Sequence, residues 1–128
     1  AESLEAAKLY ARQLGWLHTK RPKAKNSRGK ELGENAQLPP LKGAKYLMDM
    51  LLECGLADLG WRELEAWQAL TGTPINSWEA QAMIATSKAY SSAVAEFTDS
   101  NERAPYQPLD FDRDKVADQV RGALRKRR

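Results

Sequence analysis

The sequence predicts an all-α protein with a small three-helix core. Apolar residues recur at steps of three and four through several segments, which is the spacing of one helix face. No segment alternates apolar and polar residues in the manner of a half-buried strand. The 128 residues include 42% apolar and 29% charged side chains, which is ordinary for one soluble globular domain. We therefore expect a single helical domain with less compact segments on both sides of its core.

An additional N-terminal helix is expected over residues 3–14, within a segment that spans residues 1–17. Ser3 is the expected N-cap, and Gly15 provides a C-terminal stop. The apolar stripe of this helix has four members, which are Leu4, Ala7, Ala11 and Leu14. Because two of the four are alanine, the stripe is thin, and the helix is expected to need another surface on which to dock.

Residues 18–43 have the composition of a basic linker. Pro22, Pro39, Pro40 and three glycines divide this segment. Six basic side chains and no acidic one lie between residues 18 and 30. These six are Lys20, Arg21, Lys23, Lys25, Arg28 and Lys30. A segment of this kind buries little apolar surface, so we expect it to stay mobile unless a partner holds it.

The helical core is expected to occupy residues 44–99. Asn76 and Glu79 have the spacing of a capping box, so they mark the start of the longest helix. That helix is expected to support the two shorter ones through its apolar face. The three expected helices cover residues 44–56, 61–70 and 76–98.

Residues 100–128 form the last expected segment. It begins with an extended stretch that contains Pro105 and Pro108. A C-terminal helix is expected over residues 112–128, because Val116, Val120 and Leu124 give it a narrow apolar stripe. Its last four residues form a second basic arm, which consists of Arg125, Lys126, Arg127 and Arg128.

The charges are distributed unevenly along the chain. Residues 1–45 carry ten basic and four acidic side chains, a net charge of +6. Residues 46–103 carry three basic and nine acidic side chains, a net charge of −6, and residues 104–128 have a net charge of +3. An acidic centre between basic arms permits self-association, arms that fold back on the centre, or a polyanionic partner.

The sequence contains no recognisable catalytic or metal-binding constellation, and it implies no cofactor. A zinc site needs several cysteine or histidine ligands, but the chain has one of each, Cys54 and His18, far apart in sequence. A single cysteine excludes an internal disulfide and fits a reducing cytoplasm. No apolar run approaches the ~20 residues of a membrane span. We therefore expect a protein that is not an enzyme and does not contact a membrane.

Large apolar residues around the break at residues 71–74 are candidates for a partner-binding face. The alternative is that they are ordinary core residues. Trp61 and Trp78 stand at the starts of their helices, where full burial is harder, so they are the better candidates for exposure. The complete candidate set is Trp61, Leu64, Trp67, Trp78, Met83 and Tyr90.

Nucleic-acid binding is possible but not favoured. The basic arms carry charges that suit phosphates, but they lack interleaved aromatic residues for stacking on bases, and the nearest is Trp16. The break at residues 71–74 also has the form of a helix-turn-helix. Glu79 near the start of the second helix would be repelled by phosphates, which argues against DNA recognition.

The order of packing residues from residue 38 to residue 97 is distinctive. It includes Leu38-Pro39-Pro40, Tyr46-Leu47, Trp61-x-x-Leu64-x-Ala66-Trp67, Leu70-Thr71-Gly72, Ser77-Trp78-Glu79-Ala80 and Ser87-x-Ala89-Tyr90. This order resembles the helical segment of phage tail assembly chaperones from long-tailed bacteriophages. The resemblance covers about half of the chain and consists of packing residues.

The resemblance implies a non-enzymatic role in the cytoplasm of a bacterial host cell. Chaperones of this family coat the helical tape-measure protein and recruit tail-tube subunits during assembly. They are typically absent from the finished virion, and some are made in short and frameshifted long forms. The partners that it implies are therefore the tape-measure protein and the tail-tube protein.

Two other functions remain open from the sequence. The long basic linker and tail would also suit a permanent virion component, such as a head–tail or minor capsid protein. The basic arms would suit a nucleic-acid-binding module, which is the less favoured of the two alternatives.

Overall fold

The computed structural model describes residues 2–108. This part of the chain is helical and contains no β-strand, which confirms the expected all-α class. Its elements are α1 (Glu2–His18), α2 (Arg28–Leu32), the 3-10 helix η1 (Gly33–Asn35), α3 (Lys45–Cys54), α4 (Trp61–Thr71) and α5 (Ser77–Phe97). The helix expected over residues 112–128 and the second basic arm, Arg125, Lys126, Arg127 and Arg128, lie outside the described residues.

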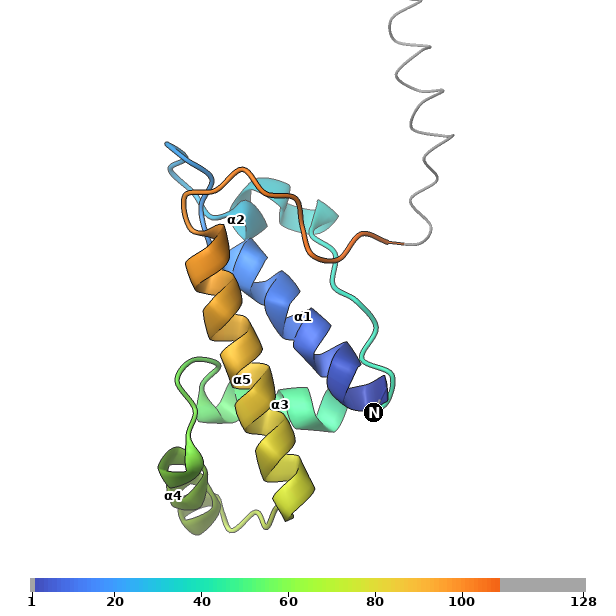
Figure 1. Ribbon diagram of the computed structural model, residues 1–128, viewed down its shortest axis with the longest axis vertical. Coiled ribbons are helices and arrows are strands. Elements are labelled where there is room, and N and C mark those ends of the chain that lie inside the picture. The colour runs from blue at the N-terminus through green and yellow to red at the C-terminus, as the bar shows by residue number, and fades with distance from the viewer. Residues whose placement is uncertain (1, 109–128) are drawn as a thin grey trace, which may run out of the picture.

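Two long helices, α1 and α5, lie side by side and form the framework of the protein (Figure 1). Small residues make this close packing possible, because Ala7 and Ala11 on α1 are buried, as is Ala93 on α5. A Cβ atom placed on Gly15 would lie 2.7 Å from the Cβ atom of Ala93 and 3.1 Å from the carbonyl oxygen of Tyr90. Glycine at position 15 therefore lets the two backbones approach each other.

Two expectations about the N-terminal helix were wrong, and a third was confirmed. Helix α1 continues through Gly15 to His18, so this glycine is a contact residue and not a stop signal. The helix already includes Glu2, and Ser3 donates a hydrogen bond from Oγ to the carbonyl oxygen of Lys42, at 3.3 Å, instead of capping α1. The helix does dock on another surface, as expected, because its small alanine side chains bring the α1 backbone itself into contact with α5.

The rest of the core comes mainly from α3 and α5. Helix α3 supplies Leu47, Met48 and Leu51, and α5 supplies Met83, all almost fully buried. The capping box at the start of α5 is confirmed. The Asn76 side chain accepts a hydrogen bond from the Glu79 backbone at 2.8 Å, and the Glu79 side chain accepts one from the Asn76 backbone at 3.0 Å.

Helix α4 lies at one end of the molecule, beside the start of α5 (Figure 1). It contributes two buried side chains, Leu64 and Trp67, and contacts α3 and α5 only sparsely. Steps of three residues fall ~60° short of a full turn, so three such steps carry a stripe half-way around the helix. Trp61, Leu64, Trp67 and Leu70 are spaced in this way, so Trp61 and Leu70 lie on opposite flanks of α4, and only Leu64 and Trp67 between them face the core.

The segment 18–43 is more ordered than its composition suggests, because Arg28 anchors it. Arg28 is 2% exposed, and its guanidinium donates hydrogen bonds to Thr19 Oγ1 at 2.6 Å and to the carbonyl oxygens of Trp16 and Ser100. The same group stacks over the Trp16 ring at 5.3 Å from its centroid. A buried charge needs such partners, and here they tie α2 to the end of α1 and to the residues after α5.

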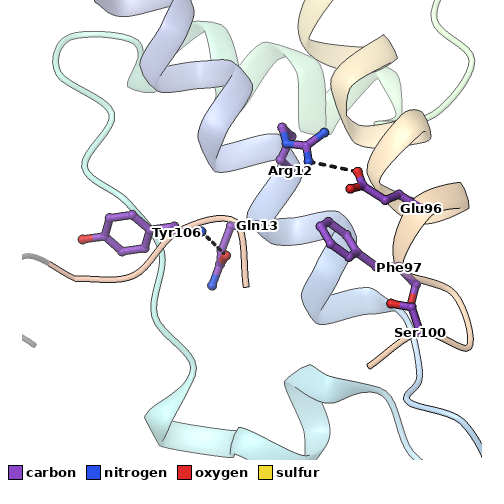
Figure 2. Close-up of polar contacts among 6 residues, drawn as sticks. All are labelled: Arg12, Gln13, Glu96, Phe97, Ser100 and Tyr106. Atoms are coloured by element: carbon purple, nitrogen blue, oxygen red, sulfur yellow. Dashed lines mark hydrogen bonds and ion pairs between the residues drawn. The ribbon is translucent and has the colours of Figure 1, made fainter. Parts of the chain in front are cut away.

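Gln13 holds two extended segments against α1. The residue is 3% exposed, and its Nε2 donates a hydrogen bond to the carbonyl oxygen of Gln37 at 3.0 Å. Figure 2 shows the Gln13 carbonyl group pointing toward the backbone of Tyr106, which donates a hydrogen bond to it at 3.1 Å. On the neighbouring face, Arg12 and Glu96 form an ion pair at 3.0 Å that links α1 to α5.

We predict that Gly15→Ala lowers the free energy of unfolding by about 1–3 kcal/mol, because the added methyl group meets Ala93 and the Tyr90 carbonyl. In a helix with free space around the glycine, the same substitution would raise the free energy of unfolding by roughly 0.5–1 kcal/mol. Urea denaturation followed by circular dichroism would measure the sign. Ala93→Gly provides the matched control in a double-mutant cycle. The double variant should lose less stability than the sum of the losses in the two single variants. A stabilised Gly15→Ala protein would contradict the close contact.

Candidate partner-binding surface

Exposed large apolar side chains gather on the elements at one end of the protein. In residues 2–108 seven such side chains are exposed, and five of them belong to α3, α4 or the first turn of α5. These five are Tyr46, Leu52, Trp61, Leu70 and Trp78. We call residues 45–80, which contain these elements, the α4 end of the molecule. Figure 1 shows α4 and the start of α5 at this end.

The structure divides the predicted partner-binding residues into two groups. Trp61 and Trp78 are 59% and 44% exposed, as expected for residues that begin a helix. Leu64, Trp67 and Met83 are buried core residues, which corrects their assignment to a binding face. They are buried because each points to the side of its helix that packs against the rest of the protein.

Tyr90 also lies away from the α4 end. It is half-buried beside α1, and its hydroxyl group lies 2.8 Å from Nδ1 of His18. Burial raises the pKa of the Tyr90 hydroxyl group. Tyr90 therefore helps to join α5 to α1 and is not placed to contact a partner together with Trp61 or Trp78.

Sequence reasoning missed Leu70, which is the most exposed large apolar residue in the described chain at 88%. Trp61, Leu64, Trp67 and Leu70 follow one another at steps of three residues, and the drift of these steps shows that the four side chains cannot share one face, but it does not show which of them is exposed. Tyr46 and Leu52 on α3 were missed as well. Their neighbours Leu47 and Leu51 occupy the buried face of the same short helix.

Helix α4 carries an outer face that no described residue covers. Its inner face consists of Leu64 and Trp67, while Ala66 and Ala69 are exposed on the opposite side. At ~100° per residue, Trp61 and Leu70 lie at the two edges of this outer face, and the exposed Arg62 and Glu65 lie between them beside the two alanines. The outer face is thus mixed, with two large apolar side chains at its edges and small and charged side chains between them. A second helix with both apolar and charged residues could pack against it.

Both ends of α4 are held by hydrogen bonds. Glu63 accepts a bond from the backbone of Gly60 at 2.9 Å and so caps the first turn. Gly72 adopts a left-handed conformation with φ of 69°, which ends the helix without strain. The side chain of Gln68 accepts a bond from the Ile75 backbone at 3.2 Å, which ties the following turn back to α4. The outer face is therefore presented by a well-terminated helix.

The α4 end is acidic. It contains six acidic and two basic side chains, and one of the bases, Lys45, forms an ion pair with Asp49 at 2.8 Å. Burial raises the pKa of Tyr46, and the nearby Glu79 carboxylate adds to this effect. The surface around the exposed apolar residues carries a negative charge.

The basic residues of the first arm lie at the opposite end of α5. Lys20, Lys23, Lys25 and Lys30 are exposed and form no ion pair within residues 2–108. Arg21 pairs with Glu31 at 2.7 Å. Arg28 is not available to a partner, because it is buried in the anchor described above, which corrects its assignment as a contact residue. Burial lowers the pKa of Arg28, and the neighbouring Arg21 adds to this.

The titratable residues outside this surface are dispersed. Within residues 2–108 no group of three or more His, Cys, Asp and Glu side chains is placed to hold a metal ion. Cys54 is half-buried, and burial together with Glu53 raises the pKa of its thiol.

A hollow of about 670 Å³ near the start of α1 is lined largely by apolar and proline residues. None of the described helices combines the length and the apolar composition that crossing a membrane requires.

No family model, curated protein or solved structure matches this chain. The functional assignment therefore depends on the α4 end and on the pattern of packing residues from residue 38 to residue 97.

We predict that the free energy of unfolding decreases as the pH falls through about 6.5, through the effect of His18. Burial lowers the pKa of His18 from its ordinary value of 6.5, so the unfolded chain takes up a proton more readily than the folded chain. Urea titrations at several pH values would measure the slope. His18→Gln should flatten it, whereas Tyr90→Phe, which keeps the ring beside His18, should preserve most of it. An unchanged slope in His18→Gln would contradict the prediction.

Proposed function

We propose that this protein is a non-enzymatic assembly chaperone of phage tails that binds the tape-measure protein through its α4 end. The proposal is carried by the exposure of Trp61 and Leu70 at the edges of the outer face of α4, together with the exposed Trp78 in the first turn of α5. The pattern of packing residues that resembles the tail assembly chaperones supports the same function. Recruitment of tail-tube subunits belongs to the proposal through that resemblance.

The exposed apolar residues favour a protein partner. Tryptophan is enriched among residues that dominate binding energy at protein interfaces. Burying apolar surface contributes about 25 cal/mol per Å² of favourable free energy. Covering these exposed residues with a partner would therefore contribute to the binding free energy. Two tryptophans and a leucine on adjacent elements therefore indicate a docking surface.

The shape of the outer face of α4 favours a helical partner. Trp61 and Leu70 are separated by nine residues, which corresponds to roughly 13 Å along the helix axis. An amphipathic helix that crosses this face would contact the two anchors with apolar side chains and could pair polar side chains with Arg62 and Glu65 between them. The acidic surroundings favour a partner whose apolar stripe is bordered by basic residues.

A tape-measure protein provides such a partner repeatedly. Its long helix presents apolar stripes that would aggregate if they stayed uncovered. A small contact at each α4 end gives weak binding of one copy, which suits a chaperone that must later leave. Many copies on one long ligand would still cover it reversibly.

We predict that Trp61→Ala combined with Leu70→Ala weakens binding to a co-expressed tape-measure protein by about tenfold or more, because both apolar anchors are lost. Pull-down and the yield of soluble tape-measure protein would measure this. The matched control is Leu32→Ala combined with Leu38→Ala, which removes two exposed leucines outside the α4 end and should leave binding unchanged.

Urea denaturation of both double variants would show whether a change in binding follows from lost stability, since Leu32 and Leu38 are only 36% and 39% exposed and their truncation also removes contacts within the protein. Failure of the parent protein to bind or solubilise any segment of a tape-measure protein would overturn the proposed function. Equal losses in the two double variants would show that α4 is not the docking surface.

We also predict that purified phage particles lack this protein, because a chaperone leaves the finished tail. Quantitative mass spectrometry of the particles, with the tail-tube protein as internal standard, would measure its abundance. A fixed stoichiometric amount in the virion would instead favour a structural head–tail or minor capsid component.

A further inference from the structure

The two ends of the protein carry opposite charges that its own fold keeps apart. The α4 end is acidic, and the loop between α1 and α2, residues 19–27, is basic. Figure 1 shows this loop projecting at the end of α5 opposite to α4. The sequence alone allowed the basic arms to fold back on the acidic centre. In the structure the loop of the first arm does not fold back on the α4 end.

The loop is fixed in its position at the C-terminal end of α5. The Asp99 backbone donates a hydrogen bond to the carbonyl oxygen of Lys20 at 3.1 Å, and Arg28 binds Ser100 on the other side of the loop. Helix α5 has 21 residues and is therefore about 31 Å long. That distance is far beyond the reach of a lysine side chain, so the loop cannot neutralise the α4 end of the same molecule.

Both charged surfaces have side chains free to pair. Within residues 2–108, Lys20 and Lys25 on the loop and Glu53 and Glu65 at the α4 end form no ion pair and are exposed. Asp99 and Glu102 also lie at the loop end, but they follow α5 and do not belong to the projecting loop. Glu31 and Glu34 likewise lie in α2 and η1 after the loop, so the loop itself, residues 19–27, contains basic but no acidic side chains.

We propose that these two surfaces bind each other in trans, so that the basic loop of one copy docks on the acidic α4 end of the next. The contact joins two different surfaces, so it is heterologous and leaves one free end at each side of a pair. Copies would therefore associate head to tail in an open row. The inference concerns the protein alone and does not require the proposed tape-measure partner.

A second copy fits the loop better than a nucleic acid does. Single-stranded nucleic acids are held by aromatic side chains that stack on bases as well as by positive charges. Trp16 is the nearest aromatic residue, but the guanidinium of Arg28 covers its ring and its Nε1 donates to the carbonyl oxygen of Glu102 at 3.1 Å. The loop therefore offers charge without a stacking surface, which matches an acidic protein surface.

Sedimentation of the purified full-length protein in the absence of other proteins tests the proposal. At about 20 mM salt the average mass should rise with protein concentration, and at about 0.5 M salt it should return to that of a monomer, since salt shortens the range of these interactions. Lys20→Glu with Lys25→Glu, and separately Glu53→Lys with Glu65→Lys, should each weaken self-association at least about tenfold. An equimolar mixture of the two variants should associate again, because each supplies the surface that the other has lost.

The matched control is Lys8→Glu with Lys88→Glu, which makes the same change in net charge away from the loop and should associate like the parent protein. A parent protein that stays monomeric at low salt, or variants that fail to associate on mixing, would overturn the proposal. So would loss of association only when Arg125, Lys126, Arg127 and Arg128 are replaced by glutamine. Binding of a single-stranded oligonucleotide through Lys20 and Lys25, more tightly than self-association, would assign the loop to a polyanion instead.

Discussion

The close packing of α1 against α5 at Gly15 is the contact on which the rest of the structure depends. With no side chain at Gly15 and only a methyl group at Ala93, the two backbones approach closely enough to bury Ala7 and Ala11 as well. The pair of long helices then provides a surface for α3, whose leucines complete the core. Small residues therefore give this interface its van der Waals contacts by letting the backbones approach closely, whereas large apolar side chains give such contacts elsewhere in the core.

Two buried polar side chains determine the path of the segments that are not helical. Arg28 joins α2 to the ends of α1 and α5, and Gln13 holds both proline-containing segments on α1. A buried polar side chain lowers stability unless its hydrogen bonds are made. The segments that supply its partners therefore have few other paths that keep these bonds. These contacts place the basic loop at one end of the molecule, where it cannot reach the acidic residues of the α4 end.

The functional surfaces follow from this arrangement. Helix α4 lies outside the α1–α5 pair and buries only Leu64 and Trp67, so no residue of the described part of the chain covers its opposite face. The same separation keeps the basic loop and the acidic end from pairing with each other within one copy. A small protein of this form has two places to bind other proteins, and both lie at the ends of its long helices.

The sequence by itself determined the helical class, the capping box of α5 and the exposure of Trp61 and Trp78, because these depend on periodicity and on residues close in the chain. The tertiary structure alone decided the roles of Gly15, Arg28 and Leu70. A glycine that ends a helix and a glycine that admits a neighbouring backbone have the same local sequence. Likewise, a basic residue in a linker becomes an anchor only when distant carbonyl groups converge on it. Which flank of a helix is buried depends on where the neighbouring helices lie, and no local pattern contains that information.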